Sequence, residues 1–260
     1  MRLIITTVLA FVSLASSQEL TGRDIMENAK EAQTMSGTEY VGTLEIYDNK
    51  GNQRIRKIAA ATKDYPAENV SKRIIRFLEP ADVKGTGMLI FDHDDQDDDM
   101  WIYLPSLRKT RRIVSTEKGK SFMGSEFSNA DMAAENMEDF EYKLLGEVEF
   151  DGIECWQIEV LPVDDDVADE NGFTRKATWI AKSDYVMRHA EFYDLFDELY
   201  KKQTNSDVRL LDEDGQKYQA AKMVMINLEN GRKSVMRMDQ VVFNPQVKDE
   251  YFTTRYLEKQ

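Results

Sequence analysis

The stretch MWIYLPSLRKTRRI, residues 100–113, has the pattern of a β-hairpin. Strand-forming residues such as Trp101, Ile102 and Tyr103 precede a Pro-Ser pair, and a second run containing β-branched residues follows it. Proline fixes its own φ near the value required at the second position of a four-residue turn, so residues 104–107 are predicted to form that turn. This turn sets three facing pairs across the hairpin: Tyr103 with Arg108, Trp101 with Thr110, and Asp99 with Arg112.

Similar runs rich in Val, Ile, Tyr and Thr continue on both sides of this hairpin, separated by short turns. The predicted strands cover residues 40–47, 53–62, 71–78, 86–91, 100–104, 107–114, 142–150, 154–161, 174–181, 187–193, 198–205, 220–228 and 234–243. Many antiparallel strands at short, even spacing indicate one large sheet that curls. The chain is therefore predicted to be mainly β, of the α+β type.

A helix is predicted before the first strand. Thr21 and Asp24 have the spacing of a capping box, in which each side chain accepts a hydrogen bond from a backbone N–H of the other residue. Four apolar residues then recur along one helical stripe: Ile25, Ala29, Ala32 and Met35. Gly37 is expected to end this helix. Two shorter helices are expected, one capped by Ser128–Asp131 and one over residues 247–257.

Residues 1–17 have the features of a secretory signal peptide. Arg2 precedes an apolar run, and small residues ending at Ser17 follow it. A membrane anchor is the alternative, but the run is shorter than the roughly 20 apolar residues that a spanning helix needs. We therefore expect export with cleavage after Ser17, which leaves residues 18–260 as a single domain.

The composition narrows the classes of function. The 260 residues contain 34 Lys and Arg against 48 Asp and Glu, a formal net charge of −14. Such an acidic surface repels phosphate, which makes nucleic acid a poor partner. Cys155 is the one cysteine and cannot form an internal disulfide, and two histidines, His93 and His189, offer little for a metal site or a catalytic triad. We expect no enzyme activity, no cofactor and no bound metal.

Two charged runs interrupt the strands. The acidic run at residues 92–99 alternates carboxylates as a calcium loop does, but Met100 and Ser106 stand where such a loop needs Gly and Glu. A solvated turn is the preferred interpretation, and cation binding is the alternative. The basic run consists of Arg108, Lys109, Arg111 and Arg112. It either pairs with aromatic and acidic residues across the hairpin or docks a headgroup or a partner.

The protein is rich in soft and aromatic side chains, with 13 Met, 3 Trp, 12 Phe and 11 Tyr. Methionine adapts its shape and suits loosely specified apolar ligands. Two late strands carry methionines at alternate positions, on one face of each strand: Met223 and Met225, then Met236 and Met238. Trp156 shares a face with Ile158 and Val160 in an earlier strand. These residues either line a cavity or fill a core, because a curled sheet accommodates both.

The hairpin residues and the segment SFMGSEFSNADM at residues 121–132 together resemble a known family. The patterns WxYLPxLxKxRRI and SFMGSxFSxxDM look like those of LolA-like outer-membrane lipoprotein-sorting proteins. The signal peptide, the helix after it and the strand series agree with this resemblance, which extends over residues 19–260.

The resemblance implies a half-open β-barrel, formed by the curled antiparallel sheet, with helices that cover the concave face and enclose an apolar cavity. Relatives are periplasmic carriers that shield acyl chains between membranes, and many accompany RND-type exporters. An arginine latches the lid of the lipoprotein carrier to its barrel, but no residue of this sequence is assigned to that role. The candidate lid here is Phe122–Met132, with Gly119 and Gly124 as hinges.

We therefore expect a periplasmic, non-enzymatic carrier or binder of lipids or lipid-modified proteins that acts as a monomer. It is expected to hand cargo from the inner membrane to the outer membrane. An RND-type transporter is a candidate partner at the inner membrane. The alternative is a periplasmic sensor of the same fold that binds a protein partner. The expected cavity contacts are Trp101, Tyr103, Phe122, Met123, Trp156, Met223 and Met225. The expected docking residues for a headgroup or partner are Arg108, Lys109, Arg111 and Arg112.

Overall fold

The computed structural model describes residues 20–259, so the predicted signal peptide at residues 1–17 lies outside the described residues. Its main feature is one antiparallel sheet of 13 strands in the order β6-β5-β4-β3-β2-β1-β13-β12-β11-β10-β9-β8-β7. The strands are β1 (Gly37–Tyr47), β2 (Gln53–Tyr65), β3 (Val70–Glu79), β4 (Gly87–His93), β5 (Asp99–Leu104), β6 (Lys109–Arg112), β7 (Phe140–Phe150), β8 (Ile153–Pro162), β9 (Arg175–Ala181), β10 (Met187–Tyr193), β11 (Leu199–Asp212), β12 (Lys217–Asn227) and β13 (Lys233–Phe243). The α-helices are α1 (Gly22–Gln33), α2 (Ser115–Lys118), α3 (Asp165–Asn171) and α4 (Thr254–Leu257), and the 3-10 helices are η1 (Pro66–Glu68), η2 (Ala130–Met132), η3 (Met137–Asp139) and η4 (Asp249–Tyr251).

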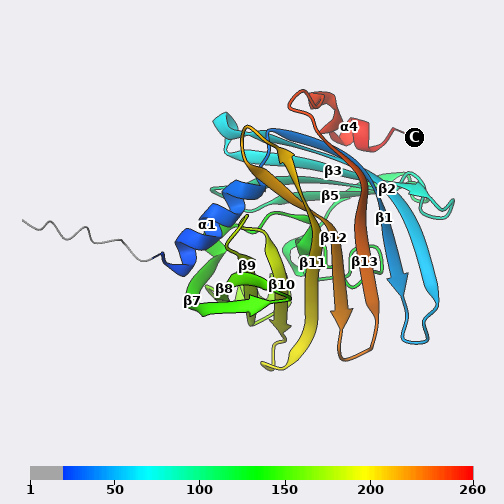
Figure 1. Ribbon diagram of the computed structural model, residues 1–260. Coiled ribbons are helices and arrows are strands. Elements are labelled where there is room, and N and C mark those ends of the chain that lie inside the picture. Colours follow the sequence, from blue (N-terminus) through cyan, green and yellow to red (C-terminus); the bar gives the residue numbers. More distant parts are fainter. Residues whose placement is uncertain (1–19, 260) are drawn as a thin grey trace, which may run out of the picture.

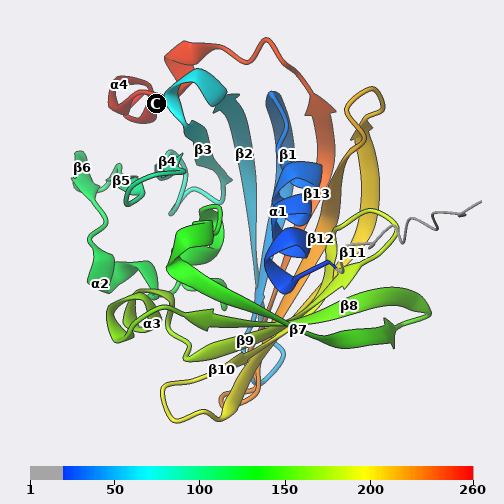
Figure 2. The same cartoon turned by 90° about the vertical axis from the view of Figure 1, so that its left-hand side faces the viewer.

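The sheet curls around one concave face, as Figures 1 and 2 show. Most neighbouring strands are consecutive in sequence, and the β1–β13 pair joins the first and last strands of the chain. In that pair Thr38 lies opposite Phe243 and Tyr47 opposite Lys233. β6 and β7 remain as the two edges, so the sheet does not close into a barrel. The predicted fold class, a large curled antiparallel sheet with helices over its concave face, is confirmed.

The covering segment, residues 113–139, connects the two edge strands and runs along the concave side of the sheet together with α1 (Figure 2). The segment links the two edges of the curled sheet, and its buried side chains place it across the concave face. A bridge between Ser121 and Ser128 closes a tight loop within it, in which the Phe122 N–H donates to the Phe127 carbonyl at 2.8 Å.

α1 begins as the sequence predicts. The Asp24 N–H donates to the Thr21 hydroxyl at 3.1 Å, and the Thr21 N–H donates to the Asp24 carboxylate at 2.8 Å, which completes the capping box. Gly22 lies against the backbone of β7, where a Cβ would come within 2.8 Å of the Tyr142 carbonyl oxygen. Close approach of two backbones requires glycine at this position. The helix is thereby seated on one edge strand of the sheet.

Three predictions of helix extent were wrong. α1 ends at Gln33, because Thr34 already has extended backbone angles, and Gly37 instead begins β1. The helix expected after Ser128–Asp131 is only the short η2, and the one expected over residues 247–257 is split into η4 and α4. Their apolar residues follow a helical spacing, but tertiary packing of these short segments outweighs that weak local preference.

The β5–β6 hairpin exists, but its register differs from the predicted one. Trp101 lies opposite Arg112, and Tyr103 opposite Thr110. The turn is longer than predicted because Arg108 adopts a left-handed φ of 50° and stays outside β6. Asp99 and Arg112 nevertheless form an ion pair, since two residues on one face of a hairpin also meet diagonally.

Apolar side chains pack on both faces of the sheet. The larger, inner cluster lies on the concave face and includes residues of α1 and the covering segment. The smaller, outer cluster includes residues of the C-terminal segment, 247–257. Consecutive residues of β3 show the division, because Ile75 belongs to the inner cluster and Ile74 to the outer one.

Candidate functional site

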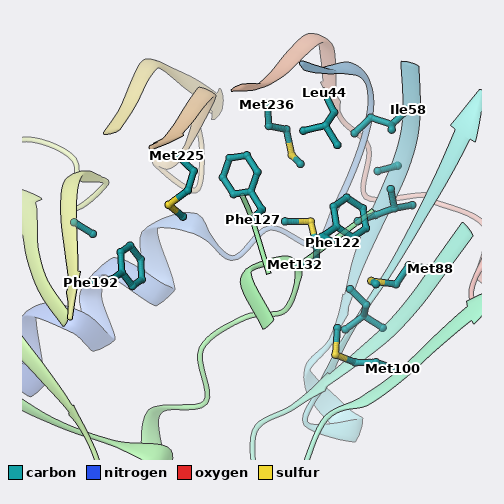
Figure 3. Close-up of a cluster of buried hydrophobic side chains, with 14 of the residues drawn as sticks. Leu44, Ile58, Met88, Met100, Phe122, Phe127, Met132, Phe192, Met225 and Met236 are labelled. Atoms are coloured by element: carbon teal, nitrogen blue, oxygen red, sulfur yellow. The ribbon is translucent and has the colours of Figure 1, made fainter. Parts of the chain in front are cut away.

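The concave face is lined by methionine and other apolar side chains from many strands. Met225 of β12 and Met236 of β13 have exposed fractions of only 1% and 2%. Met223 lies opposite Met236 in the β12–β13 ladder and packs against the same cluster. Figure 3 shows further residues around this space: Leu44, Ile58, Met88, Met100 and Phe192. The shared face predicted for Met223 and Met225 is therefore confirmed, and Met236 of the second predicted pair joins the same cluster.

The covering segment fills this space with its own side chains (Figure 3). Phe122, Phe127 and Met132 have exposed fractions of 1%, 2% and 5%. The ring of Phe122 lies 5.7 Å from that of Phe77 of β3. With the segment in place the inner face is a packed core. Displacement of the segment would uncover the apolar side chains of the inner cluster, which is what a lid over a lipid site requires.

Two arginines fasten the segment to the first half of the sheet. Arg56 of β2 donates to the Met123 carbonyl, and Arg73 of β3 donates to the Met132 carbonyl, both from inward-facing positions. The sequence-based prediction missed both residues. The signal that could have found them is a cation at an inward position within an otherwise apolar alternation, where it needs a partner from across the concave face.

Glu126 makes a second fastening from the tight loop of the segment. Its carboxylate is buried and accepts a hydrogen bond from the Asn227 amide at 3.0 Å, while the Arg232 guanidinium lies 3.0 Å from its other oxygen. Its N–H donates to the Ser234 hydroxyl at 2.9 Å. Arg232 also donates to the Gly124 carbonyl at 2.8 Å. A buried charge is tolerated when it is paired and hydrogen-bonded in this way.

A third fastening joins the segment to β9 and β7. Lys176 of β9 forms an ion pair with Glu135, and Tyr142 of β7 donates to the same carboxylate at 3.1 Å. The Lys176 ammonium also lies within 6.0 Å of three ring centres, those of Phe140, Phe173 and Phe192. Burial, followed by the charge of Glu135, raises the pKa of the Tyr142 hydroxyl and keeps it a donor. The segment is thus held by both halves of the curled sheet.

Most of the predicted cavity residues lie in or against the inner cluster: Phe122, Met123, Met223 and Met225. Trp156 of β8 also packs against this cluster, and its ring lies 5.3 Å from that of Tyr185. The structure brings these residues to one face of the sheet. Their contact with a ligand stays a prediction.

Trp101 and Tyr103 lie elsewhere. Both pack with the outer cluster beneath the C-terminal segment, on the opposite side of the sheet from the methionines. The inner positions of β5 are taken by Met100 and Ile102. The predicted facing of Trp101 and Tyr103 was wrong, because both faces of this strand are apolar and alternation alone does not say which of them is concave.

The basic run lies on and beside β6, an edge strand of the sheet. Two of its members form ion pairs: Arg111 with Glu117 at 2.5 Å, and Arg112 with Asp99. Arg108 and Lys109 are exposed, and within residues 20–259 neither has an acidic partner at ion-pair distance. These two cations are the part of the run that is available to a partner.

The histidine and cysteine side chains of the described part of the chain do not gather into a metal site. Across residues 20–259, no group of three or more His, Cys, Asp or Glu side chains is placed to hold a metal ion. His189 stacks on Phe150 with ring centres 4.7 Å apart, and burial lowers its pKa. Burial raises the pKa of the Cys155 thiol. Both side chains are packed in the sheet, where neither suits nucleophilic chemistry.

No helix within residues 20–259 combines the length and apolarity needed to cross a membrane.

Solved structures share this curled sheet. A protein domain from Vibrio parahaemolyticus named for outer-membrane lipoprotein sorting has a TM-score of 0.84 and 25% identity, covering 92% of this chain and 98% of that one. A DUF1329 family protein from Desulfovibrio piger has a TM-score of 0.83 and 28% identity, covering 91% and 97%. A LolA superfamily protein from Nitrosomonas europaea, with a TM-score of 0.69, 20% identity and 91% and 99% coverage, shares the fold. The fold is that of LolA-like proteins.

A family model described as "Uncharacterized protein" matches residues 69–259. The chain belongs to this family, DUF1329, which is LolA-like. No protein of curated function is detectably similar to it in sequence.

Proposed function

We propose that this protein is a periplasmic, non-enzymatic carrier or binder of lipids or lipid-modified proteins. The observation that supports the proposal is an apolar concave face that is closed by a separate, polar-fastened segment rather than by the sheet itself. A permanent core needs no such arrangement, whereas a carrier needs an apolar surface that can be opened and closed. The Vibrio parahaemolyticus relative is named for lipoprotein sorting, which is the same class of cargo.

The energies of closure and of cargo binding are comparable. Uncovering Phe122, Phe127 and Met132 costs about 1.5–3 kcal/mol for each side chain, or ~5–9 kcal/mol in all. An acyl chain that buries about a dozen CH₂ groups gains ~10 kcal/mol, at about 0.8 kcal/mol per group. Cargo can therefore replace the segment without a large net cost. In the proposed cycle the acyl chain enters beneath Phe122–Met132 and contacts Met123, Trp156, Met223 and Met225.

The free cations Arg108 and Lys109 are proposed to dock an acidic partner, such as a lipid headgroup or an inner-membrane transporter of the RND type. A basic edge on an otherwise acidic chain is a specific electrostatic feature, because the rest of the surface repels anions. Cargo would then pass from that membrane towards the outer membrane, with the protein acting as a monomer.

The test is mass spectrometry of organic extracts from protein purified without detergent out of its native periplasm. A stoichiometric phospholipid or lipopeptide is expected, and it should be lost when Met223 and Met225 are both changed to Asp. Ile226→Asp is the matched control, because Ile226 lies on the same strand with an exposed fraction of 39%. Circular dichroism establishes that each variant keeps its sheet.

Wild-type protein is tested in parallel for uptake of a fluorescent fatty acid, which needs no variant to fold. Lipid-free protein that also takes up no fatty acid would overturn the carrier proposal. The search would then turn to protein partners of the Arg108–Lys109 edge, as the sensor alternative requires.

A further inference from the structure

One carboxylate beneath the covering segment is poorly satisfied. Asp92 follows Met88 and Ile90 on the inward face of β4, and its exposed fraction is 6%. Its Oδ1 accepts a hydrogen bond from the Ala134 N–H at 2.9 Å. Its Oδ2 is the one buried side-chain polar atom in the described residues that has no hydrogen-bond partner. An ionised oxygen in such a place carries a desolvation cost that protonation removes.

Asp98 lies near Asp92, in the turn between β4 and β5. It is partly buried, and its Oδ1 accepts a hydrogen bond from the His93 N–H at 3.1 Å. Burial, and then the charge of Asp92, raises the pKa of Asp98 to about 7. Burial also raises the pKa of Asp92. Two nearby carboxyls do not ionise together as easily as either would alone.

Charged groups from several elements influence the pKa values of this pair. They are Arg73 of β3, Lys30 of α1, His93 of β4, Lys118 of α2 and Asp139 of η3. The three long cations are held by other partners: Arg73 by the Met132 carbonyl, Lys30 by Asp94 at 2.6 Å and Lys118 by Glu170 at 2.9 Å. Among the described residues none of them forms an ion pair with Asp92 or Asp98, so the pair is left without a neutralising partner.

Asp92 lies where the covering segment is attached to the sheet. Asp92 holds the Ala134 N–H, and Arg73 holds the Met132 carbonyl two residues earlier. Met132 is one of the side chains that fill the concave face. Asp92 is nearly buried and bonded to Ala134, so movement of this part of the covering segment would expose its carboxylate to water. Ionisation of Asp92 and displacement of the segment therefore favour each other.

We propose that Asp92 and Asp98 form a proton-binding site that controls the covering segment, such that a proton held by the pair favours the closed segment and loss of that proton favours its release. The inference goes beyond the proposed carrier function. It concerns the segment alone and requires no cargo.

The direction of the pH effect follows from linkage. In the open form both carboxyls meet water and return to ordinary pKa values near 3.9. The closed form therefore binds the proton more tightly than the open form does. Closure is most favoured below about pH 4 and is weakened as the pH rises through about 7. One coupled proton changes the opening constant by at most about tenfold per pH unit.

The test measures the distance between two spin labels as a function of pH, in protein without lipid. The labels replace two exposed residues, Asp131 of the covering segment and Glu68 of η1, in a Cys155→Ser background. A narrow distance distribution is expected at pH 5, and a longer population is expected to grow by pH 8. Circular dichroism at both pH values shows whether the sheet stays folded.

The decisive variant is the Asp92→Asn and Asp98→Asn double change, which mimics the protonated pair and should stay closed at both pH values. Asp95→Asn, on the exposed part of the same turn, is the matched control and should respond as the wild type does. If the double variant does not fold, Asp98→Asn alone should lose the response around pH 7. Equal distributions at both pH values in the wild type, or an Asn variant that responds like the control, would overturn the proposal.

Discussion

Arg56 donates a hydrogen bond to the main-chain carbonyl of Met123, so a cation from the inner face of the sheet holds the backbone of the covering segment. Arg73 does the same to Met132, at the other end of the candidate lid. Of the three apolar side chains that fill the concave face, Phe127 lies between these two points, and Phe122 and Met132 lie at them. We infer that burial of those side chains supplies most of the closing energy, while the arginines fix where the segment sits.

Removal of one arginine fastening should therefore loosen the segment without unfolding the sheet. A hydrogen bond from a charged group contributes about 1.5–3 kcal/mol, so Arg56→Gln should raise the opening constant by roughly 10- to 100-fold. Stopped-flow uptake of a fluorescent fatty acid measures this as a faster binding phase. Arg54→Gln, two residues away on β2 and exposed, is the control. Identical rates for the two variants would show that Arg56 does not restrain the segment.

The buried Glu126 offers an independent prediction. Glu126→Gln keeps a hydrogen-bond acceptor for Asn227 but removes the ion pair with Arg232. The loss of one charge-assisted contact, about 1–3 kcal/mol, should expose the loop and speed its cleavage by a protease several-fold or more. Glu138→Gln changes an exposed carboxylate of the same segment and serves as the control. Equal cleavage of both variants would assign Glu126 no part in holding the loop.

Alternation and turn residues are local signals, and they were enough to predict the strands and the curled sheet. The hairpin between β1 and β2 shows why, because Gly51, at a φ of 81°, permits the turn between the strands predicted at residues 40–47 and 53–62. The capping box of Thr21 and Asp24 is equally local. Such features depend on neighbours in sequence, so they can be recognised without the tertiary structure.

The parts that could not be predicted depend on contacts between distant segments. β5 has apolar residues on both faces, so the sequence does not say that Met100 points inward and Trp101 outward. The register of its hairpin differs from the predicted one because Arg108 lies in the turn and not in the strand. Arg56 and Arg73 have functional meaning only once the covering segment lies across the sheet. A motif located the candidate lid, but only the structure shows what holds it.

His189 gives the sheet a pH dependence opposite in sign to that of the Asp92–Asp98 pair. Burial lowers the pKa of His189, so the unfolded chain binds the proton more tightly than the folded one. Its contribution to stability is present above about pH 6.5 and is lost as the pH falls below that value. The urea concentration at the unfolding midpoint should therefore fall less between pH 7.5 and pH 5 for His189→Gln than for the wild type. An equal loss in both proteins would rule out His189 as a source of acid sensitivity.

The two faces of the sheet can be told apart with tryptophan fluorescence. Trp156 packs against the inner cluster, whereas Trp101 packs against the outer cluster. The ring of Trp179 meets that of His189 edge to face, with ring centres 4.9 Å apart. Three variants are needed, each with two tryptophans changed to Phe so that a single one remains. A fatty acid brominated along its chain should quench Trp156 and leave Trp101 and Trp179 unchanged, because bromine quenches only at short range. Quenching of Trp101 to the same extent would mean that acyl chains bind the outer face, and the concave site would have to be abandoned.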